Sequence, residues 1–284
     1  MSLIRPMSPR VVDARLQGLL KQLRLPTVAK NYETLARQAT ESGQPYPEYL
    51  LALLERELSQ RDVNRRRRLL RQARFPITYT LDTYDFTLMP SLSKPKVLEL
   101  ARGEFISKAQ NVVLLGQIGT GKTHVATALG YAACELGYKV RFFTAAALIS
   151  QLLEAHQQNQ LSRLENSLLK QHLIIIDELG FVPFSQQGAQ MLFTFISQTY
   201  QRASLLITSN LPFTEWTQVF QDTRLLGALL DRLTHHCHIL EFRGESHRFR
   251  QSQLQHATKL SPTISPKLAD QLPNVAPEEV TAMP

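Results

Sequence analysis

The stretch that decides the fold of this chain lies at residues 116–123 and reads Gly116-Gln117-Ile118-Gly119-Thr120-Gly121-Lys122-Thr123. It matches the pattern Gly-x-x-x-x-Gly-Lys-Ser/Thr in full, and it lies between an apolar run at 112–115 and a helical pattern that begins near Thr123. Such a turn lets backbone N–H groups point inward around phosphate groups, and the helix N-terminus adds a favourable dipole. We expect Lys122 to reach the terminal phosphates of a nucleotide and the Thr123 hydroxyl to ligate Mg²⁺. The alternative interpretation is an ordinary glycine-rich turn.

Two adjacent acidic residues follow a second apolar run. Residues 173–176 are Leu-Ile-Ile-Ile, which is typical of a central strand, and Asp177 and Glu178 come directly after them. We expect Asp177 to hold Mg²⁺ through water, and Glu178 to orient and deprotonate an attacking water. This pair favours a hydrolase over a phosphoryl-transfer kinase. The alternative is an acidic turn at the end of a strand.

A third apolar run ends in an amide side chain. Residues 205–208 are Leu-Leu-Ile-Thr, and Ser209 and Asn210 follow. Asn210 is predicted to lie beside the end of the Asp177 strand and to hydrogen-bond the γ-phosphate or its attacking water. Alternatively, Asn210 caps a helix that begins at Pro212.

Short apolar runs alternate with helical patterns from residue 111 onward. Strands are predicted at 112–115, 140–143, 173–176, 205–208 and 238–242, and helical stretches near 122–136, 145–158, 161–171, 186–202 and 223–235. Buried runs separated by helices indicate an α/β fold with a central parallel sheet. Residues 257–284 are rich in Pro, Ser and Thr without periodicity, and we expect this tail to be disordered.

The first third of the chain has a helical pattern. Apolar residues at helical spacing predict helices over about 12–23, 28–40 and 47–74, the last with Leu50, Leu51, Leu54 and Leu58 along it. Residues 75–95 contain three prolines and no clear period, which is typical of a linker. We therefore predict a helical N-terminal domain at 1–75, a linker with lead-in helices at 76–110, and an α/β domain at 111–256.

The positive charge is concentrated in the N-terminal third. The chain has 32 Lys and Arg against 24 Asp and Glu, and residues 1–110 contain 19 of the basic and 11 of the acidic side chains, which accounts for the whole surplus of +8. This asymmetry favours a basic module for a polyanion joined to a module with another task.

A run of arginines carries most of this surplus. The predicted DNA contacts are the arginines of its densest part, at Arg61, Arg65, Arg66, Arg67, Arg68, Arg71 and Arg74. Such a density suits contacts with phosphates, which give affinity without sequence choice. The alternatives are a solvated basic helix or a protein-docking face. The helices at 145–171 are a second candidate DNA surface, with only Arg163 and Lys170 as basic residues.

These motifs together resemble those of the AAA+ ATPases, in the branch that includes bacterial initiators and DnaC-type helicase loaders. Within that branch the chain is most similar to the IstB family, the ATPase helpers of transposition. The resemblance covers about residues 10–252. It implies a three-layer AAA+ domain preceded by a small all-α domain, with ATP and Mg²⁺ as cofactors. In this chain Gln117-Ile118 replaces the usual pair of prolines, and His247 stands where Tyr is commoner.

The resemblance also gives roles to two arginines. Arg232 resembles the arginine finger that reaches the γ-phosphate held by a neighbouring subunit, with Arg224 as its main rival. Arg248 resembles the second sensor, which acts on the nucleotide of its own subunit. Arginine suits both tasks because it stays charged and binds phosphate oxygens bidentately. The alternative is that both are surface ion-pair residues, with Asp231 or Glu245 as partners.

The expected function is that of an ATP hydrolase that forms a homo-oligomer, ring or filament, on double-stranded target DNA and recruits or activates a cognate transposase. The alternative is a DnaC-type helicase loader, because the same nucleotide site serves both. A simple nucleotide kinase is a third possibility. The chain contains no apolar stretch long enough for a membrane span and only two cysteines, so we expect it in the bacterial cytoplasm, without a membrane partner.

Overall fold

The computed structural model describes residues 8–220, 222–244 and 246 of the 284-residue chain. The predicted disordered tail at 257–284 and the sensor candidate Arg248 lie outside the described residues.

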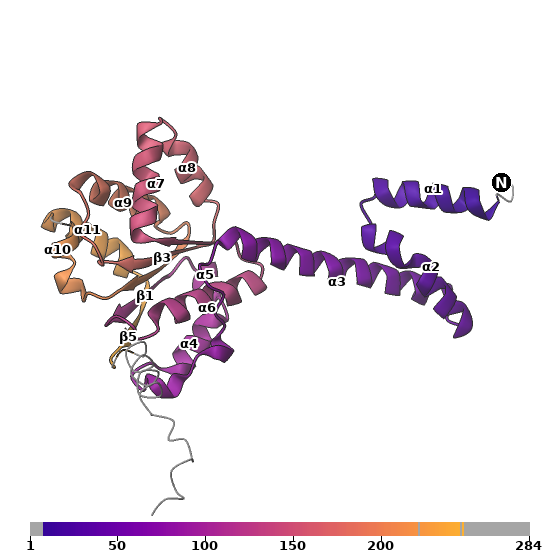
Figure 1. Ribbon diagram of the computed structural model, residues 1–284, viewed down its shortest axis with the longest axis horizontal. Coiled ribbons are helices and arrows are strands. Elements are labelled where there is room, and N and C mark those ends of the chain that lie inside the picture. The colour runs from indigo at the N-terminus through magenta and orange to yellow at the C-terminus, as the bar shows by residue number, and fades with distance from the viewer. Residues whose placement is uncertain (1–7, 221, 245, 247–284) are drawn as a thin grey trace, which may run out of the picture.

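A five-stranded sheet forms the centre of the larger part of the molecule (Figure 1). Its strands are β1 (Asn111–Gly116), β2 (Val140–Thr144), β3 (Leu173–Leu179), β4 (Ser204–Ser209) and β5 (Cys237–Phe242). They lie in the order β2-β3-β4-β1-β5, and every neighbouring pair is parallel. The predicted α/β class with a central parallel sheet is therefore confirmed.

Helices cover both faces of the sheet because successive side chains along each strand point to opposite faces. On β3, Ile174 and Ile176 pack with one set of helices: α7 (Ala145–Gln157), α8 (Leu161–Leu168), α9 (Gln186–Thr199), α10 (Thr217–Phe220) and α11 (Thr223–Thr234). Leu173 and Ile175 pack with the other set: α4 (Lys94–Ala101), α5 (Glu104–Ser107) and α6 (Lys122–Glu135). The result is the three-layer arrangement seen in Figure 1.

Three helices precede this α/β body. They are α1 (Pro9–Gln22), α2 (Pro26–Glu41) and α3 (Tyr46–Ala73), and α3 projects from the body with α1 and α2 at its far end (Figure 1). Leu20, Val28 and Leu53 form a small core between them. The apolar residues Leu50, Leu51, Leu54 and Leu58 of α3 are instead 43–61% exposed.

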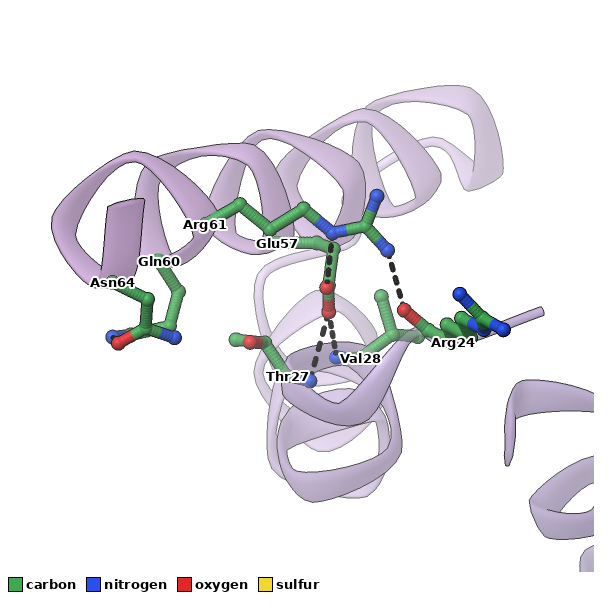
Figure 2. A network of polar contacts seen from close by, with 7 residues as sticks. All are labelled: Arg24, Thr27, Val28, Glu57, Gln60, Arg61 and Asn64. Carbon is green, nitrogen blue, oxygen red and sulfur yellow. Dashed lines mark hydrogen bonds and ion pairs between the residues drawn. The ribbon is translucent and has the colours of Figure 1, made fainter. Parts of the chain in front are cut away.

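A buried carboxylate joins α3 to the start of α2 (Figure 2). Glu57, whose side chain is 2% exposed, accepts hydrogen bonds from the backbone N–H groups of Thr27 (2.8 Å) and Val28 (3.2 Å). Arg61 donates from Nε to Glu57 (2.8 Å) and from Nη2 to the carbonyl of Arg24. Because Leu25 at the N-cap of α2 has no side chain that can cap the helix, Glu57 supplies the missing acceptor.

The other end of α3 belongs to the packing of the α/β body. Leu69 and Ala73 are buried in the same apolar cluster as β1 and α6, and Phe75 packs against this cluster. Arg66 forms an ion pair with Glu135 of α6 (3.5 Å), and Arg141 of β2 donates to the carbonyl of Gln72 (2.9 Å). We therefore propose the boundary at residue 75 as a division of the sequence only, since the last turns of α3 pack with the α/β body.

Candidate functional site

A cavity of about 600 Å³ lies at the carboxyl ends of β1, β3 and β4. These ends lie at one edge of the sheet because all the strands are parallel. The predicted site residues that line the cavity are Ile118, Gly119, Thr120, Gly121, Lys122, Thr123, Asp177, Glu178 and Asn210. The fold thus brings together residues from three separate predicted motifs.

The loop after β1 has the backbone that the phosphate-binding motif predicts. Gly121 has φ +90°, a region that favours glycine, and it precedes the first residue of α6. A Cβ atom at this position would lie 2.9 Å from the Tyr84 ring, so the loop is also closely covered. Lys122 donates from Nζ to the carbonyls of Gly116 (2.6 Å) and Gln117 (2.7 Å). Its ammonium group therefore lies inside the loop.

Three side chains from different elements meet beside Lys122. The Thr123 hydroxyl lies 3.1 and 3.0 Å from the two carboxylate oxygens of Asp177, and Thr208 of β4 donates to Asp177 Oδ1 at 2.5 Å. Asp177 is 3% exposed, and its burial raises its pKa, although the hydrogen bonds from Thr208 and Thr123 act in the opposite direction. Hydroxyl and carboxylate oxygens are ligands that Mg²⁺ prefers, so this group fits the expected metal.

Thr208 was missed by the sequence reasoning, which selected Asn210 from the same strand end. Thr208 also accepts a hydrogen bond from the backbone N–H of Glu178 (2.9 Å). The sequence did contain a signal for Thr208, because its hydroxyl lies near the end of an apolar run, as Asp177 does in the preceding run.

Glu178 has an unusual backbone conformation. Its φ is +61°, and the pairing of β3 with β4 shifts register between Ile176 and Leu179. A left-handed conformation costs a residue with a side chain on the order of 1 kcal/mol or more, and such strain clusters at functional sites. The irregularity places Glu178 as an exposed residue on the cavity wall, directly after the buried Asp177.

Asn210 also lines the cavity. Its Oδ1 atom is buried and has no hydrogen-bond partner among the described residues. A buried amide oxygen without a partner is uncommon and costs about 1–3 kcal/mol, so a bound group or water that donates to it would remove the cost. The 3-10 turn after it begins at Phe213 with Pro212 as its N-cap residue, so Asn210 does not cap it.

The segment 76–89, here called the cover segment, forms another wall of the cavity. Sequence reasoning treated it as part of a linker, but Pro76, Ile77, Tyr79, Thr83, Tyr84, Asp85, Leu88 and Met89 line the cavity. His124, the residue after the motif, stacks on Tyr79 at 4.2 Å between ring centroids. Its Nε2 lies 3.2 Å from both Thr80 O and Thr83 Oγ1. Burial lowers the His124 pKa, which favours the neutral imidazole.

The two finger candidates lie outside this cavity, on α11. Arg232, in the last turn, is half-buried and donates from Nη1 to Ser197 Oγ of α9 (3.1 Å). Arg224, in the first turn, is exposed. The described part of the chain contains no ion pair between Arg232 and Asp231.

The predicted DNA-contacting arginines of α3 fall into two groups. Arg61 is bound to Glu57, Arg66 is paired with Glu135, and the guanidinium group of Arg65 lies beside Gly137. The exposed remainder consists of Arg67, Arg68, Arg71 and Arg74. Across the described ranges, Arg67, Arg68 and Arg71 form no ion pair and no side-chain hydrogen bond.

Sequence comparison identifies relatives along most of the chain. A protein of insertion sequence IS5376 from Geobacillus stearothermophilus, named as an ATP-binding protein, is 36% identical over 85% of this chain and 96% of the relative. A protein of insertion sequence IS21 from Pseudomonas aeruginosa, named in the same way, is 37% identical over 84% of this chain and 90% of the relative.

Solved structures share the fold. AMPPCP-bound DnaA from Aquifex aeolicus is 19% identical with a TM-score of 0.52, over 64% of this chain and 56% of that one. A DNA replication initiation factor is 20% identical with a TM-score of 0.50, over 64% and 54%. The chain thus spans little more than half the length of these structures, and the likeness concerns the AAA+ fold alone.

Two further findings concern membrane-spanning helices and family membership. No helix among the described residues has the length and apolar character needed to cross a membrane. The family described as IstB-like ATP binding protein matches residues 18–255, which include the phosphate-binding motif, Asp177, Asn210 and α3. The chain therefore belongs to the IstB-like family of ATP-binding proteins, with an AAA+ fold.

Proposed function

We propose that this protein is a Mg²⁺-dependent ATP hydrolase that assembles on double-stranded DNA and there recruits or activates a transposase, in the bacterial cytoplasm. One observation carries the proposal: a single chain joins the cavity with Lys122, Thr123 and Asp177 to an arginine face on α3 that no described carboxylate neutralises. The names of the insertion-sequence relatives support the link with transposition.

The nucleotide chemistry follows from the cavity. Phosphate oxygens would replace the carbonyls of Gly116 and Gln117 as partners of Lys122, since they carry a full negative charge. Mg²⁺ would take oxygen ligands from Thr123 and, through water, from Asp177. Asn210 Oδ1 would accept a hydrogen bond from the attacking water, and Glu178 would take its proton. The water oxygen then bonds to the γ-phosphorus as the bond to ADP breaks.

The nucleobase would lie toward the cover segment. This wall offers apolar and aromatic side chains such as Ile77, Tyr79 and Leu88, whereas the opposite end offers charged groups such as Lys122. A nucleoside triphosphate has the same division between an aromatic base and a charged phosphate chain. Ile77 and Leu88 are also 55% and 36% exposed, so a bound base would remove apolar surface from water.

The DNA surface would be the outward face of α3, formed by Arg67, Arg68 and Arg71. Their guanidinium groups are exposed and have no described anionic partner, so binding to phosphates breaks no existing ion pair. Arg61 differs because its guanidinium group already serves Glu57 and the Arg24 carbonyl. Three phosphate contacts per subunit give affinity for any sequence, and assembly multiplies them.

Assembly would be controlled by ATP. Arg232 lies outside the cavity of its own chain, so its proposed contact with a γ-phosphate requires a second copy. ATP between two copies would then join them, and hydrolysis would release them.

The experiment is duplex DNA binding as a function of salt, with ATP or a slowly hydrolysed analogue. Replacing Arg67, Arg68 and Arg71 with Ala should weaken binding to all sequences and flatten the slope of log affinity against log salt by about 2.7, while ATP still binds. The matched control replaces the exposed Arg10, Arg15 and Arg37 of α1 and α2, which removes the same charge elsewhere.

Three outcomes would contradict the proposal. They are a lack of duplex binding in ATP, an α3 triple variant that binds like the parent, and a control that weakens binding equally. Preference for single strands or dependence on a helicase would indicate a DnaC-type loader instead. Co-purification of a transposase from the native cell tests the partner.

A further inference from the structure

Arg232 is held by an unusual set of partners. Its Nη1 donates to Ser197 Oγ at 3.1 Å, and its guanidinium carbon lies 5.4 Å from the centroid of the Phe193 ring. Both partners belong to α9, four residues apart and therefore on one face of that helix. The packing of Leu229 and Leu233 of α11 into the same apolar cluster as α9 fixes the two helices relative to each other.

All of these partners are neutral. Among residues 8–220, 222–244 and 246, no carboxylate forms an ion pair with Arg232. A surface arginine that only joins two helices would gain most from a carboxylate, whose charge would cancel its own. A hydroxyl and an aromatic face hold the guanidinium group in place without cancelling its charge.

This arrangement suits an arginine that must bind phosphate later. The Phe193 ring lies beside the guanidinium group, and of its five N–H donors one is used in a hydrogen bond to another described residue. Fixing the side chain in advance also lowers the conformational entropy that docking would cost.

We propose that Phe193 and Ser197 are positioning residues that keep the Arg232 guanidinium group ordered and charge-uncompensated for the phosphate of a nucleotide held by a second copy of this chain. The inference rests on the proposed action of Arg232 across the subunit contact. It adds two residues of α9 to the site, although neither lines the cavity of its own chain.

The test uses the full chain, with ATP turnover measured over a range of protein concentrations, with and without duplex DNA. Ser197→Ala should lower kcat by about 3- to 10-fold with little change in the KM for ATP, because one hydrogen bond to the finger is lost. Ser197→Thr keeps the hydroxyl, so its kcat should match that of the parent. Phe193→Leu keeps the apolar contact and should lower kcat in the same way.

The decisive variant is Ser197→Asp. A carboxylate there would hold Arg232 more firmly but would cancel its charge, so kcat should fall to the level of Arg232→Ala while the melting temperature is not lowered. Thr194→Asp, at an exposed position of the same helix, controls for an acidic residue on α9 and should leave kcat unchanged.

The outcomes separate the finger role of Arg232 from the positioning role of Phe193 and Ser197. If Arg232→Ala turns over like the parent, the trans-acting finger and the positioning role both fail. If Arg232→Ala is inactive but Ser197→Asp is fully active, the positioning role alone is overturned, because the contact with α9 is then only structural. DNA binding is scored separately, so its failure affects neither result.

Discussion

The hydroxyl of Thr123 lies 3.0 and 3.1 Å from the carboxylate oxygens of Asp177, although 54 residues separate the two in the chain. Thr123 is the second residue of α6 and Asp177 lies near the end of β3, with β4 between β3 and β1 in the sheet. The two oxygen-bearing groups proposed to hold Mg²⁺ therefore lie within hydrogen-bond distance of each other.

The first prediction concerns this pair. Thr123→Ala should weaken Mg²⁺-dependent ATP binding by about 10- to 100-fold, because a metal ligand is lost. Thr123→Ser retains the hydroxyl and should bind like the parent. Titration of a fluorescent ATP analogue with Mg²⁺ and with EDTA measures the effect. Equal binding by Thr123→Ala in Mg²⁺ would contradict the assignment.

Glu178→Gln should separate binding from turnover. The amide cannot take a proton from water, so hydrolysis should fall by about 10²- to 10⁴-fold while ATP affinity is retained. Glu215→Gln changes an exposed glutamate outside the cavity lining and should be neutral. Normal phosphate release by Glu178→Gln would exclude Glu178 as the general base.

The cover segment should control nucleotide affinity more than chemistry. His124→Ala removes the contacts with Thr80 and Thr83 and the stack on Tyr79. We expect KM for ATP to rise about 2- to 10-fold with kcat nearly unchanged. Steady-state kinetics with ATP and GTP provides the test, and a fall in kcat at constant KM would place His124 in the chemical step instead.

Two inactive variants should restore each other. Lys122→Ala lacks the phosphate-binding ammonium group and Arg232→Ala lacks the finger, so each alone should hydrolyse almost no ATP. A mixed assembly contains contacts with one intact cavity and one intact finger. ATPase activity should therefore recover in mixtures whose mixed composition is verified by affinity tags. Absence of recovery would show that Arg232 is not a finger acting on a second copy. Recovery with Arg224→Ala in place of Arg232→Ala would assign the finger role to Arg224 instead.

The Glu57 network should make the N-terminal helices sensitive to acid. Burial alone would raise the Glu57 pKa, but hydrogen bonds from Arg61, Val28 and Thr27 outweigh it and hold the pKa below the ordinary 4.5. A lowered pKa stabilises the folded state above pH 4.5, and this contribution is lost as the pH falls through the folded-state value. Glu57→Gln should cost about 1–3 kcal/mol of stability at pH 7.

Thermal melts of the helical signal at several pH values measure this contribution. The difference between parent and variant should shrink as the solution is acidified below pH 4.5. A difference that does not depend on pH would show that the charge of Glu57 contributes nothing.

The sheet could be predicted from sequence because its inner strands β1, β3 and β4 contain continuous apolar runs, and all five strands were found where β1 to β5 lie. Residues such as Lys122 and Asp177 could be chosen because their motifs tie them to strand ends. The cover segment could not be predicted to line the site, because its sequence has no periodic pattern. Tyr79 and Tyr84 are placed at the cavity by tertiary contacts with His124 and Gly121.

The arginine run shows a second limit. Arg61 and Arg67 belong to the same arginine run and cannot be told apart by sequence. Arg61, however, binds the buried carboxylate of Glu57, one helical turn earlier, which caps the start of α2. The apolar residues of α3 show the same limit, because Leu53 is buried while Leu54 is 43% exposed. Spacing predicts that a helix forms, but the neighbouring helices decide which of its faces is buried.

The unbroken course of α3 has a mechanical consequence. Leu53 lies in the small N-terminal core and Leu69 in the core of the α/β body, and the helix between them spans about 24 Å. No loop interrupts α3, and its last turns pack against α6, the helix that follows the phosphate-binding loop. A tilt of about 10° at that contact would swing Leu53 through roughly 4 Å. A small change in the packing of α3 against α6 would thus displace the N-terminal helices by a larger distance.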